Sequence, residues 1–252
     1  MKFEIVTLFP DYFTLSLKQS LVGKAWEKKL FDISIVDLRE FATDKHRTVD
    51  DTPYGGGGGM VLKVEPLDRC LNSLGWSHRE DAAKRETEAV IMTSAAGDKL
   101  TQDRAIRYSL MDRVTIVCGH YQGVDERIMS LYDIEEVSIG DYILSGGEPA
   151  AAVIVDSVAR LIPKVLGNFE SAIEDSFMNE LLGAPSYTKP SEYRGIKVPE
   201  VLMSGNHAEI RSFRRAEAIR KCLERRPDLL ENAELSDEDL KLIRSLKKNI
   251  DR

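Results

Sequence analysis

Three short segments rich in glycine follow apolar, β-branched runs, and together they have the composition of a ligand-binding site. They are Thr93 to Gly97, Cys118 to Gly123 and Ile139 to Gly147, called here the first, second and third glycine loops. Glycine tolerates positive φ angles and lets the backbone approach a bound molecule closely. Because parallel α/β sheets bind ligands beyond the carboxyl ends of their strands, these loops predict a site where peptide groups contact an adenine ring and a ribose. One such loop alone is better explained as a tight turn, whereas three favour a site.

The third glycine loop is the most informative segment. It follows the strand-like run Glu136 to Ile139, contains Gly140, Gly146 and Gly147, and leads into a helix that opens at Glu148-Pro149. A strand, a glycine loop and a helix N-terminus form the cradle of many nucleotide-like ligands. The dinucleotide fingerprint G-x-G-x-x-G is absent, so the sequence predicts a small-molecule site of another kind.

A long polar segment, residues 39–63, separates a predicted strand from a predicted helix. It carries Lys45-His46-Arg47 and, after Tyr54, five consecutive glycines at 55–59. No Lys-Ser or Lys-Thr pair follows these glycines in the register of a phosphate-binding P-loop. Ordering five glycines costs much conformational entropy. A flexible surface loop and a phosphate-facing lid are both consistent with this composition.

A basic stripe lies on the predicted helix 207–225, within a chain whose formal net charge is −7. Such a stripe is a candidate phosphate-contacting face. The alternative is a solvated helix whose acidic neighbours neutralise the stripe, and charge alone does not separate the two interpretations. The basic residues are Arg211, Arg214, Arg215, Arg220, Lys221, Arg225 and Arg226, and the acidic ones are Glu209, Glu217 and Glu224.

Several other chemistries are poorly supported by the sequence. The four histidines are scattered and no H-E-x-x-H occurs, so no metal site is expected, and His120 and His207 are interpreted as structural. No G-x-S-x-G elbow is present. Three cysteines without a C-x-x-C pair indicate free, buried thiols in a reducing compartment. With no apolar stretch as long as a membrane span and no signal peptide, we expect a cytoplasmic protein with no membrane partner.

Alternating strand and helix patterns predict a mostly parallel α/β domain over residues 1–166. A linker at residues 167–178 and a smaller all-helical domain at residues 179–252 follow, with no strand after Ser176. The capping-box pair Ser236 and Asp239 predicts the start of the last helix. The predicted strands are 3–9, 33–38, 90–94, 114–118 and 136–139, and the predicted helices are 12–28, 65–74, 102–110, 126–132, 149–166, 207–225 and 237–249.

Six stretches of the chain form a specific combination. They are Leu8 to Pro10, Asp44 to Met60, Val117 to Arg127, Ser138 to Glu148, Glu174 to Phe177 and Val201 to Gly205. Together they resemble the bacterial tRNA (guanine-N1)-methyltransferases of the SPOUT class, and the resemblance covers nearly the whole chain. The polar insertion at residues 76–88 matches least.

This resemblance implies an S-adenosylmethionine-binding domain whose backbone forms a deep trefoil knot, a topology that is rare among protein chains. It implies a homodimer with active sites at the subunit interface. The implied reaction methylates N1 of the guanosine on the 3′ side of the anticodon (position 37), and the implied partner is tRNA. A Mg2+ ion could take part, although no magnesium cage can be read from the sequence.

The resemblance also implies roles for particular residues. Asp175 matches the proposed general base, and Arg160 matches a residue near the reacting guanine. The RNA is expected near Asp50, Tyr54 and Gly59 in the polar segment, and near Ser204, His207, Arg211, Arg214 and Arg215 in the helical domain. The methyl donor is expected to contact Met92, Thr93, Ser94, Gly97, Gly119, Tyr121, Gln122, Ile139, Gly140, Asp141, Tyr142, Ile143, Leu144, Gly146 and Gly147.

The sequence departs from the family pattern at four positions. Gln122 stands where glutamate is common, Ala95 and Gly58 where proline is common, and Asn206 where histidine is common. Gln122 removes a negative charge close to the expected donor, which argues against a charge-based hold on the sulfonium there. Three alternatives stay open: a SPOUT enzyme that methylates the ribose or another base, a nucleotide-dependent phosphotransferase, and a non-catalytic RNA-binding module.

Overall fold

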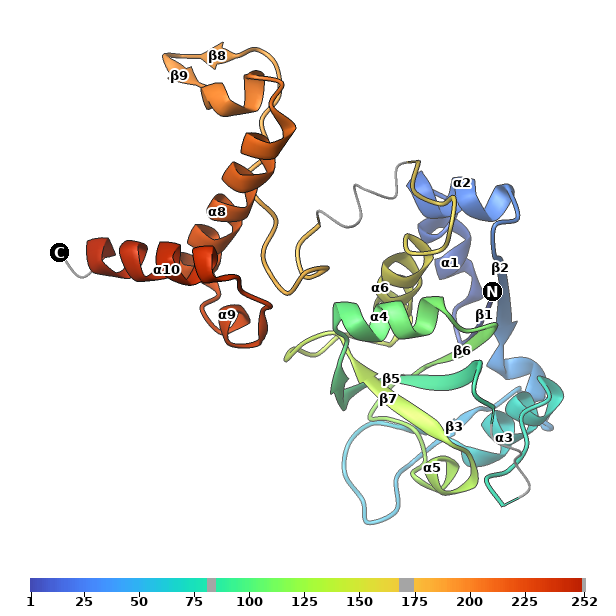
Figure 1. Cartoon of the computed structure of the whole chain (residues 1–252). Coiled ribbons are helices and arrows are strands. Elements are labelled where there is room, and N and C mark those ends of the chain that lie inside the picture. The colour runs from blue at the N-terminus through green and yellow to red at the C-terminus, as the bar shows by residue number, and fades with distance from the viewer. Residues whose placement is uncertain (81–84, 168–174, 251–252) are drawn as a thin grey trace. The chain divides into compact units, whose positions relative to one another are not determined.

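The structure is a computed structural model that describes residues 1–80, 85–167 and 175–250 (Figure 1). The chain divides into two compact units, Met1–Gly167 and Asn168–Arg252. Each unit has its own hydrophobic core, so each is described by itself.

A five-stranded parallel sheet forms the centre of the first unit, as the alternation of strand and helix patterns predicted. Its strand order is β2-β1-β6-β5-β7, and every pairing is parallel. Crossovers of this kind need a helix between successive strands. The knot implied by the family resemblance stays a prediction. The strands are β1 (Lys2–Thr7), β2 (Asp32–Asp37), β5 (Glu88–Lys99), β6 (Arg113–Cys118) and β7 (Ile134–Ser138).

Helices cover both faces of this sheet (Figure 1). Alternate residues of β1 point to opposite sides, so Phe3 and Ile5 enter one core and Val6 enters the other. The first core also takes side chains from α1 (Pro10–Ser16), α2 (Ser20–Glu27), α4 (Gln102–Ser109) and α6 (Glu148–Ala159). The second takes side chains from α3 (Val64–Ser73) and α5 (Arg127–Leu131).

Several predicted element boundaries were wrong. The helix expected over 12–28 is two helices, α1 and α2, and Ser20 at their junction has a φ of 59°. The helix expected over 149–166 ends at Ala159, before Pro163, whose ring disfavours helical geometry in the preceding residue. The polar segment 39–63 contains a 3-10 turn (Leu38–Phe41) and two short antiparallel strands, β3 (Asp50–Asp51) and β4 (Val61–Leu62).

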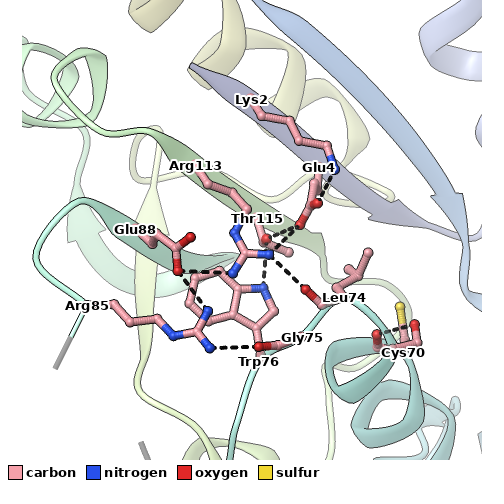
Figure 2. Close-up of polar contacts among 11 residues, drawn as sticks. Lys2, Glu4, Cys70, Leu74, Gly75, Trp76, Arg85, Glu88, Arg113 and Thr115 are labelled. Carbon is pink, nitrogen blue, oxygen red and sulfur yellow. Dashed lines mark hydrogen bonds and ion pairs between the residues drawn. The ribbon is translucent and has the colours of Figure 1, made fainter. Parts of the chain in front are cut away.

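A polar network closes the sheet at the amino ends of β1, β5 and β6 (Figure 2). Glu4 is only 2% exposed, and its Oε2 accepts a hydrogen bond from Thr115 Oγ1 at 2.8 Å. Trp76 Nε1 donates to the same hydroxyl at 2.9 Å. The guanidinium of Arg113 lies 3.8 Å from Glu4 Oε2 and 3.1 Å from Glu88 Oε2. The network therefore anchors the segment around Trp76 at the sheet edge opposite the glycine loops.

The second unit is mainly helical, with α8 (His207–Arg225), α9 (Leu229–Asn232) and α10 (Asp237–Ile250). Its core contains Ile219 and Cys222 of α8. The capping box is confirmed, because Ser236 N donates to Asp239 Oδ2 at 2.9 Å and Asp239 N donates to Ser236 Oγ at 3.2 Å.

The expectation that no strand follows Ser176 was wrong. A hairpin of β8 (Glu192–Tyr193) and β9 (Ile196–Lys197) precedes a 3-10 turn, Glu200–Met203. Its two-residue turn has positive φ at both Arg194 (51°) and Gly195 (78°), the conformation of the tight turns that match strand twist. No helix among the residues that the structure describes is long and apolar enough to cross a membrane.

Candidate active site

The three glycine loops meet at the carboxyl ends of β5, β6 and β7. Gly119 N donates to Thr93 Oγ1 at 3.1 Å, and Thr93 Oγ1 donates to Val117 O at 3.3 Å. Gly147 N donates to Gly119 O at 2.7 Å. One buried threonine and one backbone hydrogen bond thus join all three loops at the sheet edge where ligands of parallel sheets bind.

Close packing explains most of the glycines in these loops. A Cβ on Gly147 would lie 1.9 Å from Thr93 Oγ1, and a Cβ on Gly97 would lie 2.4 Å from the carbonyl carbon of Glu136. A Cβ on Gly146 would lie 2.4 Å from His120 Nδ1. Gly140 needs its glycine for conformation, since its φ is 147°. Three of these four glycines therefore allow one segment to press against another.

The first glycine loop is a bulge within β5 rather than a loop after a strand. Pairing with β7 skips from Thr93 to Asp98, so residues 94–97 bulge out of the ladder. The side chain of Met92 is buried in the second core. Met92 can therefore offer a ligand only its peptide groups, whereas Ser94 is half-buried and Ala95 is exposed.

The third glycine loop exposes apolar side chains at the site. Tyr142 is 54% exposed, Ile143 83% and Leu144 40%. Two contacts hold the loop in place. Tyr142 OH donates a hydrogen bond to Ile139 O at 3.3 Å, and Asp141 forms an ion pair with Lys99 at 2.7 Å. Exposed apolar side chains beside the backbone of glycine loops suit the lining of a small-molecule site.

The polar segment expected to face RNA is joined directly to the second glycine loop. Gln122 N donates to Met60 O at 3.0 Å, and Leu62 N donates to Gly123 O at 3.0 Å. A Cβ on Gly59 would lie 2.7 Å from Gln122 Cγ. The structure thus brings a residue predicted for the substrate, Gly59, against one predicted for the methyl donor. Tyr54 is fully exposed, at 102%.

A buried carboxylate beside the third glycine loop was missed by the sequence reasoning. Glu148 begins α6 and is 4% exposed, and its Oε1 accepts a hydrogen bond from Thr7 Oγ1 at 2.8 Å. Its Oε2 lies 3.9 Å from His120 Nδ1. Burial, with a smaller contribution from Glu148, raises the pKa of the Cys118 thiol well above its ordinary value, so this cysteine is inert at neutral pH. In the sequence, only the position of Glu148 directly after Gly146 and Gly147 indicated that this carboxylate lies at the site.

The two residues predicted for catalysis belong to different units. Arg160 is half-buried and forms the C-cap of α6, where its N–H bonds to Asp156 O at 3.3 Å. Asp175 is half-buried and lies in the second unit. Their joint action on a guanine stays a prediction. Residues 168–174, which include most of the predicted linker and Glu174 of the family motif, lie outside the described residues.

Part of the basic stripe on α8 is used within the second unit. Arg215 donates to Asp239 Oδ2 at 3.1 Å and to Glu234 O at 2.7 Å, which ties α8 to α10. Lys221 donates to Gly183 O at 3.0 Å. For these two residues the structure favours the structural interpretation. Ser204, His207 and Arg211, near the start of α8, have exposed side chains and keep their predicted role open.

Among the described residues no group of three or more His, Cys, Asp or Glu side chains could hold a metal ion.

The α8 helix is capped by Asn206, whose Oδ1 accepts hydrogen bonds from Ala208 N at 3.2 Å and from Glu209 N at 3.4 Å. The departure from histidine at this position therefore serves the helix start, since asparagine is among the best N-cap residues.

Comparison with known proteins identifies the family of the chain. A sequence model described as tRNA (Guanine-1)-methyltransferase TrmD matches residues 1–232. A tRNA (guanine-N(1)-)-methyltransferase of Persephonella marina is 50% identical over 251 residues, which cover 99% of this chain and 96% of the relative. One of Brevibacillus brevis is 49% identical over 246 residues, with 98% of each chain covered. The chain therefore belongs to the tRNA (guanine-1)-methyltransferase family.

Proposed function

We propose that this protein transfers a methyl group from S-adenosylmethionine to N1 of the guanosine on the 3′ side of the anticodon in tRNA. The observation that carries the proposal is the packing of three glycine loops at the carboxyl ends of β5, β6 and β7, in a chain of this family. Main-chain groups of these loops, with Tyr121 and Gln122, form the proposed cradle of the donor. The exposed apolar residues 142–144 would cover its adenosyl part.

The reaction is an in-line displacement on the methyl carbon. The bond from sulfur to the methyl group breaks, the bond from carbon to guanine N1 forms, and the N1 proton must leave. Asp175 is the proposed acceptor of that proton. An ordinary aspartate has a pKa of about 3.9 and is a weak base, so charge that develops on guanine O6 needs stabilisation. The guanidinium of Arg160 is the proposed source of that stabilisation, as a preorganised positive charge.

The substrate side of the proposal uses both units. A base must leave its stack to reach a pocket, and unstacking is easiest in a single-stranded loop such as the anticodon loop. Asp50, Tyr54 and Gly59 in the polar segment are proposed RNA contacts, because they lie on the segment joined to the second glycine loop. Arg211 and Arg214 at the start of α8 are proposed phosphate contacts.

A second copy of the chain is part of the proposal. Tyr12 and Leu15 of α1 and Val153 of α6 are 41%, 74% and 44% exposed, and α1 packs against α6. A homodimer that covers this apolar surface would remove it from water. We propose that the protein acts in the cytoplasm, because its proposed substrate is tRNA. A requirement for Mg2+ would be tested by adding a chelator to the assay.

Mapping the methyl group tests the proposal. Two tRNA transcripts that differ only in guanosine or adenosine after the anticodon are incubated with donor and enzyme, then digested to nucleosides. We expect 1-methylguanosine from the first transcript and no methylation of the second. A methyl group on ribose or on another base would identify a different methyltransferase. Absence of donor binding in calorimetry, with RNA binding retained, would indicate an RNA-binding module.

A further inference from the structure

Glu148 places a carboxyl group in the interior beside the proposed donor site. It occupies the first turn of α6, where the helix dipole favours a carboxylate. Its Oε1 accepts a hydrogen bond from the hydroxyl of Thr7. The same hydroxyl accepts a hydrogen bond from Phe9 N at 2.9 Å. A carboxylate oxygen accepts hydrogen bonds, so Oε2 can accept one from a nearby donor.

His120 provides the only side-chain nitrogen near Oε2 in the described part of the chain. Its Nδ1 lies 3.9 Å from Oε2, is buried, and has no hydrogen-bond partner. The ring is fixed between Phe9, with centroids 5.1 Å apart, and Tyr121, with centroids 4.6 Å apart. A buried nitrogen without a hydrogen-bond partner thus faces a carboxylate oxygen across a gap that a shift of about 1 Å would close into a hydrogen bond.

The gap between these groups lies next to Gly146. A Cβ there would lie 2.4 Å from His120 Nδ1 and 2.5 Å from Glu148 Oε2. The backbones of His120 and Gly146 also form an antiparallel bridge. The side-chain pair therefore lies directly against the junction of the second and third glycine loops.

We propose that Glu148 is a positioning residue for the methyl donor, acting through His120. The carboxylate sets the histidine tautomer with the proton on Nδ1 and draws the ring toward α6. This holds Gly146 and Tyr121, on either side of the proposed cradle, in the spacing that the donor needs. The inference rests on the proposed function only in identifying the ligand of these loops.

The surroundings of the imidazole point to this tautomer. The titratable side chains in contact with it are Glu148 from α6 and Tyr121 from its own loop. The carboxyl oxygen of Glu148 is the group that faces Nδ1, at 3.9 Å. The tautomer of a histidine follows the hydrogen bond made by its ring nitrogen, and a carboxylate accepts but does not donate.

The tautomer can be measured without relying on activity. Long-range ¹H–¹⁵N spectra of the full-length protein with ¹⁵N-labelled histidine report which ring nitrogen carries the proton, and His120→Gln assigns the signals. We expect a protonated Nδ1 in the wild type. In Glu148→Gln the amide NH2 faces Nδ1 while its oxygen accepts from Thr7, so we expect the proton to move to Nε2. A bare Nδ1 in the wild type overturns the inference.

Donor binding is the second measurement. In Glu148→Gln we expect the donor's Kd from calorimetry and its KM to rise by roughly tenfold, the size of one lost charge-assisted hydrogen bond. The KM for tRNA and kcat at saturating donor should stay within about twofold of the wild-type values. Glu65→Gln is the matched control, since Glu65 is an exposed glutamate in the first turn of α3. It should leave both constants unchanged.

The outcomes separate the inference from the proposed function. Equal donor affinity of wild type and Glu148→Gln overturns the inference and leaves the methyltransferase proposal intact. A wild type that binds no donor overturns the proposed function, whatever the tautomer. If Glu148→Gln does not fold, Thr7→Val removes the hydroxyl that orients the carboxylate and accepts the hydrogen bond from Phe9 N. It should then weaken donor binding without changing kcat, and an unchanged Kd in that variant overturns the inference.

Discussion

Replacing Arg113 with methionine should destabilise the first unit far more than its partly exposed position suggests. The guanidinium lies between Glu4 and Glu88, donates to Leu74 O at 2.7 Å, and lies 4.2 Å from the centroid of the Trp76 ring (Figure 2). When Arg113 is replaced, Glu88 still forms its ion pair with Arg85, at 2.7 Å between Oε2 and Nη1. Glu4 keeps the Thr115 hydroxyl and Lys2, whose own side chain is 48% exposed. The cost therefore comes mainly from Glu4.

Removing one partner of a buried ion pair costs about 3–5 kcal/mol. Because Lys2 stays 2.6 Å from Glu4 Oε1, we expect the lower end of that range for Arg113→Met, about 3 kcal/mol. Lys2→Ala breaks a partly solvated pair and should cost about 0–1 kcal/mol. Adding Glu4→Gln to Arg113→Met removes the buried carboxylate that has lost the guanidinium, so the double variant should be more stable than Arg113→Met alone.

Urea titration at neutral pH, followed by tryptophan fluorescence, measures these free energies of unfolding, and the substitution Trp26→Phe in every protein leaves Trp76 of the network as the only tryptophan. The double-mutant cycle compares the wild type, Arg113→Met, Glu4→Gln and the double variant. It gives the coupling free energy between Arg113 and Glu4. A cost below about 1 kcal/mol for Arg113→Met would refute the reasoning. So would a double variant less stable than Arg113→Met, because Glu4 would then not be the source of the cost.

Three further predictions concern the site and the sheet edge. Gly147→Ala should abolish donor binding in calorimetry, because its Cβ would lie 1.9 Å from Thr93 Oγ1, whereas Gly58→Ala, with nothing within 4 Å, should bind donor normally. Asp175→Ala should lower single-turnover methylation by about 10²–10⁴-fold while donor affinity stays unchanged, and near-normal turnover would reject it as the base. Burial, the largest single effect, raises the pKa of Glu135, but hydrogen bonds from Arg107 and Tyr108 outweigh it and lower that pKa. The resulting stability is present above the unfolded pKa of about 4.3 and is lost as pH falls through the folded value, so Glu135→Gln should lose less stability than wild type between about pH 5 and about pH 3 in urea titrations.

The sheet and the location of the site could be predicted because their causes are local. Apolar β-branched runs such as Val114 to Cys118 form buried strands, and glycines directly after them mark the ligand edge. The reason for the glycines was only partly predictable. Gly146 and Gly147 are required by contacts with distant residues, His120 and Thr93, and no pattern of spacing records such a contact.

Other features depend on contacts that sequence reasoning does not reach. The pairing of Glu148 with Thr7 spans 141 positions, so the carboxylate looked like an ordinary helix-start residue. The hairpin of β8 and β9 was missed because each strand has only two residues, too few for alternation to show. Arg215 looked like a phosphate ligand by charge alone, and only the fold shows its bond to Asp239.

The backbone ladder between residues 60–62 and 122–125 has a thermodynamic consequence. Met60, Leu62, Gln122 and Asp125 share alternating hydrogen bonds of 2.9–3.0 Å, so the segment proposed for RNA and the loop proposed for the donor cannot move independently. Linkage is reciprocal: whatever factor the nucleic acid applies to the affinity for the sulfonium compound, that compound must apply to the affinity for the nucleic acid. The shared hydrogen bonds therefore couple the two binding equilibria, so that a change in one affinity is accompanied by a change in the other.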